Sequence, residues 1–178
     1  MEKPNMKKPG VKKFWLMVSM ALGAAFAQAD TLEITVEIPR LEVAEYHRPY
    51  VAIWLQQQSN VTNLAVWYDV GMKEGKGQEW LKDMRQWWRR SGRALEFPID
   101  GVTAATRAPG IHTLTFDSAD KPLSELPPGD YQLVVEAARE VGDREMVSIP
   151  FSWPLSEAQT LEASGETELG RVGLQLKP

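Results

Sequence analysis

The stretch from Thr31 to Ile38 alternates polar and apolar residues, and this alternation most strongly constrains the fold of the chain. Leu32, Ile34, Val36 and the final isoleucine occupy every second position. In an extended chain, successive side chains point to opposite faces, so these apolar residues share one face. The pattern therefore predicts a β-strand that buries one face in a core.

Short apolar runs of similar character recur along the rest of the chain, separated by residues that favour turns. Further strands are expected at residues 50–56, 63–68, 111–116, 131–138, 146–153, 159–161 and 168–176. The first two of these form a hairpin around Gln58–Asn60, and the last two pair through Ser164–Glu166. Pro127–Gly129 marks another turn. About seven short strands without alternating helices favour an all-β fold, an antiparallel β-sandwich of roughly immunoglobulin-like form.

One segment has the periodicity of a helix. Apolar residues recur every three to four positions from Gln78 to Arg90, as on the buried face of an amphipathic helix. Gly75 and Gly77 precede the segment and Gly92 follows it, and glycines commonly bracket helices. The sequence predicts a helix at 78–90, inserted between strands and lying across one end of the sandwich.

The N-terminus has the features of an export signal. Lysines precede an apolar run from Phe14 to Phe26, and Ala27–Ala29 follows it as a cleavage site. Residues 1–29 are therefore expected to be a signal peptide, and residues 30–178 a single mature domain in the periplasm. Because the apolar run is shorter than the about 20 residues that cross a bilayer, we do not expect the mature protein to span the membrane.

The expected mature chain is acidic and contains no cysteine. Removing residues 1–29 takes away five Lys and one Glu, which changes the net charge from −4 to −8. Nucleic acid is a poor ligand for such a chain, because phosphates require a basic surface. The absence of cysteine excludes c-type haem and cysteine-ligated iron–sulfur clusters. His47 and His112 have no partner at ligand spacing and no triad context, so neither a metal site nor hydrolytic catalysis is predicted.

A redox role would therefore need an added organic cofactor, and the segment Asp100–Thr106 is a candidate for carrying one. Its residue pattern is Asp, two positions of any residue type, Thr, a small residue, Ala and Thr. That order resembles the acceptor sequence of the FMN-bearing periplasmic subunits of sodium-pumping and Rnf-type redox complexes. In those subunits a flavin transferase attaches FMN through a phosphoester. The resemblance implies FMN on Thr106, with Ala104 in place of the usual Gly.

The residue types in this segment suit that chemistry. Thr106 supplies the hydroxyl nucleophile. Ala105 is small, so the chain next to Thr106 is narrow enough to enter the active site of a transferase. Thr103 offers a hydroxyl that can form a supporting hydrogen bond. Asp100 is expected to order the turn or to orient the hydroxyl. Arg107 places a fixed positive charge beside the attached phosphate.

Four residues of the predicted helix are further candidates for contacts with the cofactor. Trp87 and Trp88 have flat rings that can stack on an isoalloxazine. Arg89 and Arg90 stand at the end of the helix, where they could hold a phosphate or an anionic partner. The alternative is structural: the tryptophans pack in the core and the arginines form a solvated face.

Several other motifs resemble those of one exported bacterial family. They are Glu-Tyr-His-Arg-Pro-Tyr at 45–50, Val-Ala-Ile-Trp-Leu at 51–55, Trp-Leu-Lys at 80–82 and Trp-Trp-Arg-Arg-Ser-Gly-Arg at 87–93. On these motifs most of the mature chain resembles the family known as domain of unknown function 2271. The resemblance implies an electron-transfer setting, because members of that family neighbour flavin transferases and membrane PepSY-type redox proteins.

The sequence therefore predicts a periplasmic electron carrier, and not an enzyme, with a flavin transferase and a membrane redox protein as partners. Two alternatives remain. One is a non-redox binding module that presents its helix and aromatic residues to a partner. The other is an accessory of metal uptake, in which His47 and carboxylates hold a cation. Colour separates them, because only an attached flavin would make the protein yellow.

Overall fold

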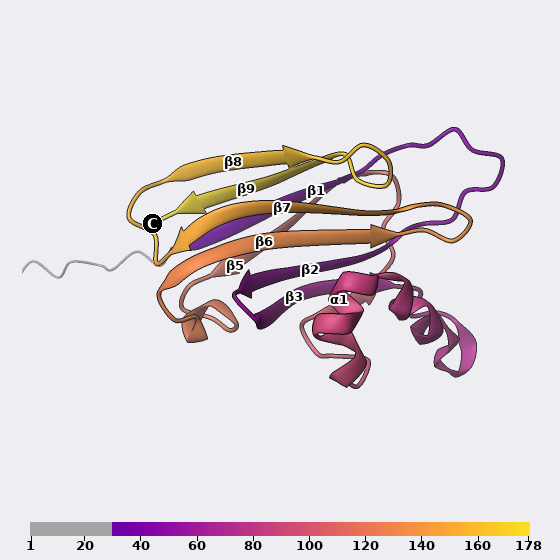
Figure 1. The fold of residues 1–178 in the computed structure, drawn as a ribbon, viewed down its shortest axis with the longest axis horizontal. Helices are drawn as coiled ribbons and strands as arrows, with labels where there is room; N and C mark the ends of the chain where they lie inside the picture. Colours follow the sequence, from indigo (N-terminus) through magenta and orange to yellow (C-terminus); the bar gives the residue numbers. More distant parts are fainter. Residues whose placement is uncertain (1–29) are drawn as a thin grey trace, which may run out of the picture.

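Two β-sheets packed face to face form the fold of the protein (Figure 1). The computed structural model describes residues 30–178, so the expected signal peptide at 1–29 lies outside the described residues. The first sheet has the order β5-β1-β9-β8, from β1 (Thr31–Ile38), β5 (Gly110–Asp117), β8 (Gln159–Ser164) and β9 (Arg171–Lys177). The second has the order β4-β3-β2-β6-β7, from β2 (Tyr50–Gln57), β3 (Asn60–Tyr68), β4 (Thr103–Ala105), β6 (Gly129–Ala138) and β7 (Arg144–Trp153). The predicted all-β sandwich is confirmed.

The strands expected from the sequence are present, with ends shifted by a few residues. β2 and β3 form the predicted hairpin, and β8 pairs with β9 in antiparallel fashion. The sequence did not predict β4, which pairs in parallel with the end of β3 and places Ala105 opposite Tyr68. The candidate acceptor segment is therefore held by a sheet, and is not only a loop between strands.

The space between the two sheets is the main core. Leu32, Ile34 and Val36 of β1 are fully buried there, as their alternation predicts. Val51 and Ile53 of β2 face them from the second sheet, and Leu133 and Val135 of β6 lie in the same cluster. Burial of such side chains stabilises a fold by roughly 1.5–3 kcal/mol each, so this cluster dominates the stability of the sandwich.

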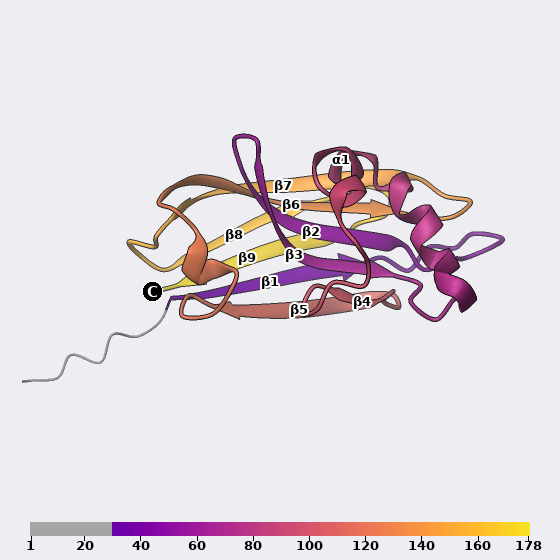
Figure 2. The same cartoon turned by 90° about the horizontal axis from the view of Figure 1, so that it is seen from below.

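The outer face of the second sheet is buried as well. Trp54 and Tyr68 on that face pack against Leu81, Met84 and Trp87 of the helical segment, which lies against this sheet in Figure 2. The helical segment thus covers the face of a sheet, and does not lie across an end of the sandwich as the sequence suggested. Because both faces of this sheet are covered, the strands at its centre are apolar on both sides.

The helix expected at 78–90 is divided in two in the structure. A 3₁₀ helix, η1, spans Lys73–Asp83, and a short α-helix, α1, spans Arg85–Arg90. Met84 lies between them with a ψ of 72°, which is not helical. Two short 3₁₀ turns complete the helical elements of the described residues, η2 (Gly92–Ala94) and η3 (Leu123–Glu125).

A buried carboxylate explains where α1 begins. Glu136 of β6 is fully buried, and its two oxygens accept the backbone N–H groups of Gln86 at 3.0 Å and Trp87 at 2.7 Å. The N–H groups in the first turn of a helix have no partner within the helix, and a negative charge at that end is favourable. Arg144 completes the cluster through an Nη1 to Oε1 contact of 2.9 Å. A strand residue therefore caps this helix.

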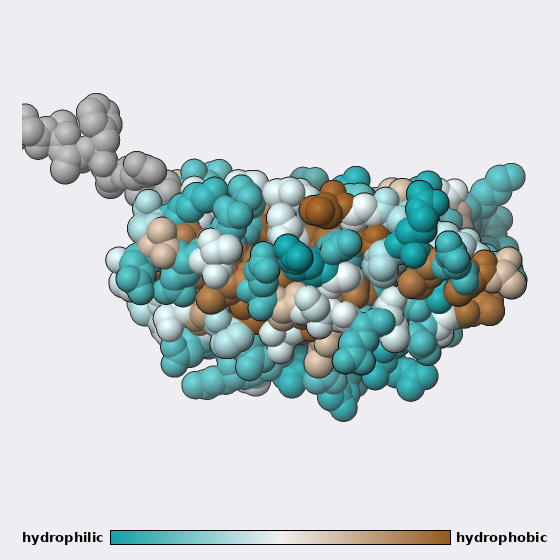
Figure 3. All heavy atoms as spheres, turned by 90° about the horizontal axis from the view of Figure 1, so that it is seen from above, coloured by the Kyte–Doolittle hydropathy of each residue, from teal (hydrophilic) through white to brown (hydrophobic). Residues whose placement is uncertain are grey.

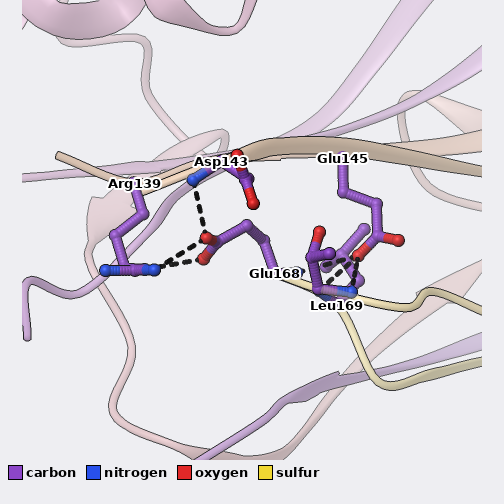
Figure 4. Close-up of polar contacts among 6 residues, drawn as sticks. Arg139, Asp143, Glu145, Glu168 and Leu169 are labelled. Atoms are coloured by element: carbon purple, nitrogen blue, oxygen red, sulfur yellow. Dashed lines mark hydrogen bonds and ion pairs between the residues drawn. The ribbon is translucent and has the colours of Figure 1, made fainter. Parts of the chain in front are cut away.

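Two further carboxylates fasten the β8–β9 connection to the end of β6 and the start of β7 (Figure 4). Glu145 accepts the four successive backbone N–H groups of residues 166–169. Glu168, which is 2% exposed, accepts two hydrogen bonds from Arg139, at 2.8 and 3.0 Å. It also accepts the N–H of Asp143 at 2.9 Å. Chain segments distant in sequence are thereby joined by charge-assisted hydrogen bonds.

Acid should weaken the protein through Glu145. Burial alone would raise the pKa of this carboxyl, but the four backbone N–H groups outweigh burial and lower the pKa below its ordinary value. The unfolded chain has the ordinary pKa of about 4.3. The stabilisation is therefore complete above that pH and is lost as the pH falls through the lower pKa of the folded state.

The measurement is the free energy of unfolding by urea, followed from about pH 6 down to about pH 2. Glu145→Gln should reduce the decline in stability with acid. Glu162→Gln is the matched control, because Glu162 is exposed and its carboxylate makes only a long contact of 3.9 Å with the Arg171 guanidinium. This variant should leave the decline in stability unchanged. An unaltered decline in Glu145→Gln would contradict the role assigned to this carboxylate.

Candidate functional site

A cavity of about 540 Å³ lies at one end of the second sheet. Antiparallel pairing brings the start of β2, the end of β3 and the end of β6 together at this end of the sheet. The cavity is lined by the segments next to these strand ends, by the last residues of the β1–β2 connection, by η1 and by the end of β4. Its volume lies in the range of roughly 300–1,000 Å³ that is typical of small-molecule sites.

Thr106, the last residue of the candidate acceptor segment, forms part of the cavity wall. Its N–H donates to the carbonyl of Tyr68 at 3.2 Å, which continues the pairing of β4 with β3 by one residue. Thr106 is half-buried, and its neighbour Ala105, also in the wall, is exposed. The residue that carries the candidate hydroxyl therefore stands at a cavity, next to a small side chain.

The opposite end of the acceptor segment is a tight turn. The N–H groups of Val102 and Thr103 both donate to the carbonyl of Ile99, at 3.2 and 2.9 Å. Gly101 has a φ of 71°, a left-handed conformation that glycine adopts without strain. The Thr103 hydroxyl accepts the Ile99 N–H at 2.8 Å, which is a supporting hydrogen bond of the kind predicted. Asp100 is exposed in this turn.

The other residues expected to contact a cofactor lie away from the cavity wall. Arg107 is exposed, with its guanidinium 5.3 Å from the ring centroid of Trp67. Arg89 and Arg90 are exposed at the end of α1. None of these three arginines is part of the wall. The cations that do face the cavity come from other segments, Arg48 and Arg139.

The helix tryptophans also differ from the sequence-based expectation. Trp87 is fully buried under the second sheet, and its indole N–H donates to the Asn63 side chain at 2.8 Å. It has no exposed face for a flavin, which corrects the stacking role assigned from the sequence. Trp88 is half-buried against the same cluster. Both rings pack where the apolar face of an amphipathic helix normally packs.

Trp80 is the tryptophan that the structure places at the cavity. It is 43% exposed and lies in the wall with Tyr46 and Tyr50. The sequence contained one signal for it, since Trp80 and Tyr46 both belong to the quoted family motifs. Their spacing in the sequence did not indicate that either residue would line the same cavity as Thr106.

Arg139 and Tyr46 belong to the wall, and each has a buried polar atom that lacks a hydrogen-bond partner among the described residues. The Arg139 side chain is 6% exposed and binds Glu168, but its second terminal nitrogen, Nη1, has no hydrogen-bond partner among the described residues. The Tyr46 hydroxyl is also without a partner there. Burial raises the pKa of that hydroxyl, so it remains a donor at neutral pH. The Arg139 guanidinium lies 5.9 Å from the Tyr46 ring centroid, within range of a cation–π contact.

His47 links two of the segments around the cavity. Its ring nitrogens lie 2.9 Å from Glu45 and 3.5 Å from Glu140, so it joins the β1–β2 connection to the end of β6. Within residues 30–178, no group of three or more His, Cys, Asp or Glu side chains is arranged to hold a metal ion. No helix in the same residues is long and apolar enough to cross a membrane.

The face of the molecule drawn in Figure 3 is mostly hydrophilic. Teal and white residues cover most of this face, and brown hydrophobic residues are scattered over it, some of them at the end where the β6–β7 connection lies. Val70 and Met72, which line the cavity, are 48% and 39% exposed. Apolar surface is therefore accessible at the cavity as well as within it.

The fold and the site define a β-sandwich protein with a ligand-sized cavity at one end of its helix-covered sheet. Residues 31–171 match the model of a family described as predicted periplasmic protein (DUF2271), and the chain belongs to this family. The match covers the cavity and the whole acceptor segment, and the family description places the protein in the periplasm. Neither the curated proteins nor the solved structures contain a match to the chain.

Proposed function

We propose that this protein is a periplasmic electron carrier whose FMN is attached through a phosphoester to Thr106. One observation supports this function above the others. The last residue of the acceptor-like segment is partly exposed and also belongs to the wall of a cavity of about 540 Å³. A modifying enzyme can therefore reach this residue, and a cofactor attached to it has space beside it.

The attachment would be made by a flavin transferase with FAD as the donor. The Thr106 hydroxyl oxygen forms a bond to the flavin-side phosphorus of FAD. The pyrophosphate bond breaks, AMP leaves with the electron pair, and the hydroxyl proton passes to a base of the transferase. This chain contributes by presenting the hydroxyl: Ala105 is small, and the Thr103 hydroxyl already holds the turn through the Ile99 N–H.

The redox chemistry of such a carrier comes from the flavin. The chain contains no cysteine, so thiol chemistry and cysteine-ligated clusters are unavailable to it. A site at the end of a sheet is accessible to partners, which suits exchange of electrons with a membrane redox protein. In this function the protein is a substrate of the transferase and not itself an enzyme.

The test is modification of Thr106. The full chain with its export signal is co-expressed with a flavin transferase, and the peptide that contains residues 103–107 is examined by mass spectrometry. Thr106→Ala should abolish the FMN adduct, whereas Thr106→Ser should retain it, because serine keeps the nucleophile. Thr103→Ala should only weaken labelling, since its hydroxyl supports the turn. Asp100→Ala should reduce labelling without unfolding the protein, because exposed side chains contribute little to stability.

A control acceptor protein in the same cells establishes that the transferase is active. Absence of an adduct on the wild type beside a modified control would overturn the electron-carrier function. A colourless, unmodified protein would instead favour a binding module that uses the cavity for another ligand.

A further inference from the structure

We infer that the isoalloxazine ring of this flavin is held inside the cavity beside Thr106, against the exposed face of Trp80, and does not project from the loop. The inference rests on the function proposed above. It concerns a separate property, because FMN on Thr106 could either fold back into the cavity or remain in solvent.

The placement of Trp80 is the first argument. A Cβ atom at Gly77 would lie 2.0 Å from the carbonyl oxygen of Asp69, so only glycine allows η1 to approach the β3–η1 connection this closely. That approach brings Trp80 to the cavity wall with 43% of its surface exposed. Flat aromatic rings stack favourably on one another, and an exposed indole at a cavity commonly marks a binding surface.

The second argument is the pair of polar groups without partners. The Arg139 Nη1 and the Tyr46 hydroxyl are buried donors that bind nothing within residues 30–178. Buried donors normally have hydrogen-bond partners, and leaving one unpaired is unfavourable. A small rotation of either side chain would expose its donor to the cavity, where the carbonyl oxygens and ring nitrogens of an isoalloxazine could accept it. Both residues belong to the cavity wall.

The third argument is geometry. Thr106 is itself part of the wall, so the flexible ribityl phosphate chain only has to fold back for the ring to enter the same cavity. The volume of about 540 Å³ suits a cofactor of this size. Trp67 offers no alternative, because it is 2% exposed in the core between the sheets, with the Arg107 guanidinium 5.3 Å from its ring centroid.

The experiment uses flavin fluorescence in the exported, flavin-modified protein. An indole in contact with an isoalloxazine quenches its fluorescence, so the wild type should fluoresce several-fold less than free FMN. Trp80→Leu should raise that fluorescence clearly, with some quenching remaining from Tyr46 and Tyr50 in the same wall. Trp88→Leu is the matched control, because Trp88 is a half-buried tryptophan outside the cavity wall, and it should leave the quenching in place.

A second variant tests the polar wall while it preserves the aromatic ring. Tyr46→Phe removes only the unpartnered hydroxyl and should shift the visible absorption bands of the bound flavin. Mass spectrometry of each sample establishes that FMN is on Thr106 before its spectra are compared. Circular dichroism establishes that each variant is folded.

The outcomes separate the two proposals. An adduct on Thr106 with fluorescence equal to that of free FMN, unchanged by Trp80→Leu, would overturn the cavity inference and leave the proposed function intact. An absent adduct beside a modified control acceptor would overturn both. Quenching that Trp80→Leu relieves and Trp88→Leu does not would support the ring's position in the cavity.

Discussion

Replacing Glu136 with glutamine should lower the free energy of unfolding by about 3 kcal/mol. The side chain is fully buried, and its two oxygens accept the N–H groups that begin α1, at Gln86 and Trp87. Glutamine retains one oxygen and turns an NH₂ group toward a donor. The substitution also removes the charge that pairs with Arg144. The two oxygens of Glu136 together accept three hydrogen bonds, from Gln86, Trp87 and Arg144.

Urea denaturation measures this effect, and Glu33→Gln provides the matched control. Glu33 is partly exposed and lies 3.6 Å from Lys177, so its loss should cost less than about 1 kcal/mol. Hydrogen exchange adds a local readout, because the amides of Gln86 and Trp87 should exchange faster in the Glu136 variant. Equal destabilisation by the two variants would show that Glu136 does not cap α1.

Separating Arg139 from Glu168 should have an effect of similar or larger size. Both side chains are at most 6% exposed, and they share two hydrogen bonds. Arg139→Met or Glu168→Leu alone leaves a buried charge without its partner, which typically costs about 3–5 kcal/mol. The double variant removes both charges and should therefore cost clearly less than the sum of the two single variants.

A double-mutant cycle measures the coupling between these two residues. The exposed pair Lys121–Glu125 is the matched control, and its coupling should be about 0.5 kcal/mol or less. If the free-energy changes of the two single variants add up to that of the double variant, the ion pair between Arg139 and Glu168 contributes no coupling energy. Arg139 also lines the cavity. The ion pair therefore both stabilises the β6–β7 end and holds one side chain of the cavity wall in place.

The sandwich was largely predictable from the sequence because its signals are local. Leu32, Ile34 and Val36 alternate with polar residues, and that period of two identifies a strand and its buried face without any long-range information. Turn residues mark the hairpin of β2 and β3 in the same way. Each of these patterns lies within about ten residues of chain, where backbone geometry alone decides which side chains share a face.

The helical segment and β4 were predicted less well because distant residues decide them. The period of Trp80, Met84 and Trp87 indicated one helix, but Glu136, about fifty residues away, caps a new helix after Met84. The short strand β4 has no alternating pattern of its own. It is a strand because the end of β3 pairs with it.

The sequence by itself determined the candidate acceptor segment, because Asp100, Thr103 and Thr106 lie within seven consecutive residues and their order indicates their chemistry. It also determined the strands other than β4, and the family that the chain resembles. Only the tertiary structure decided that Trp80 and Arg139 share a cavity with Thr106. The physical reason is that the pairing of strands in a sheet brings together strand ends that are far apart in the sequence. No local periodicity indicates which of these ends will be neighbours.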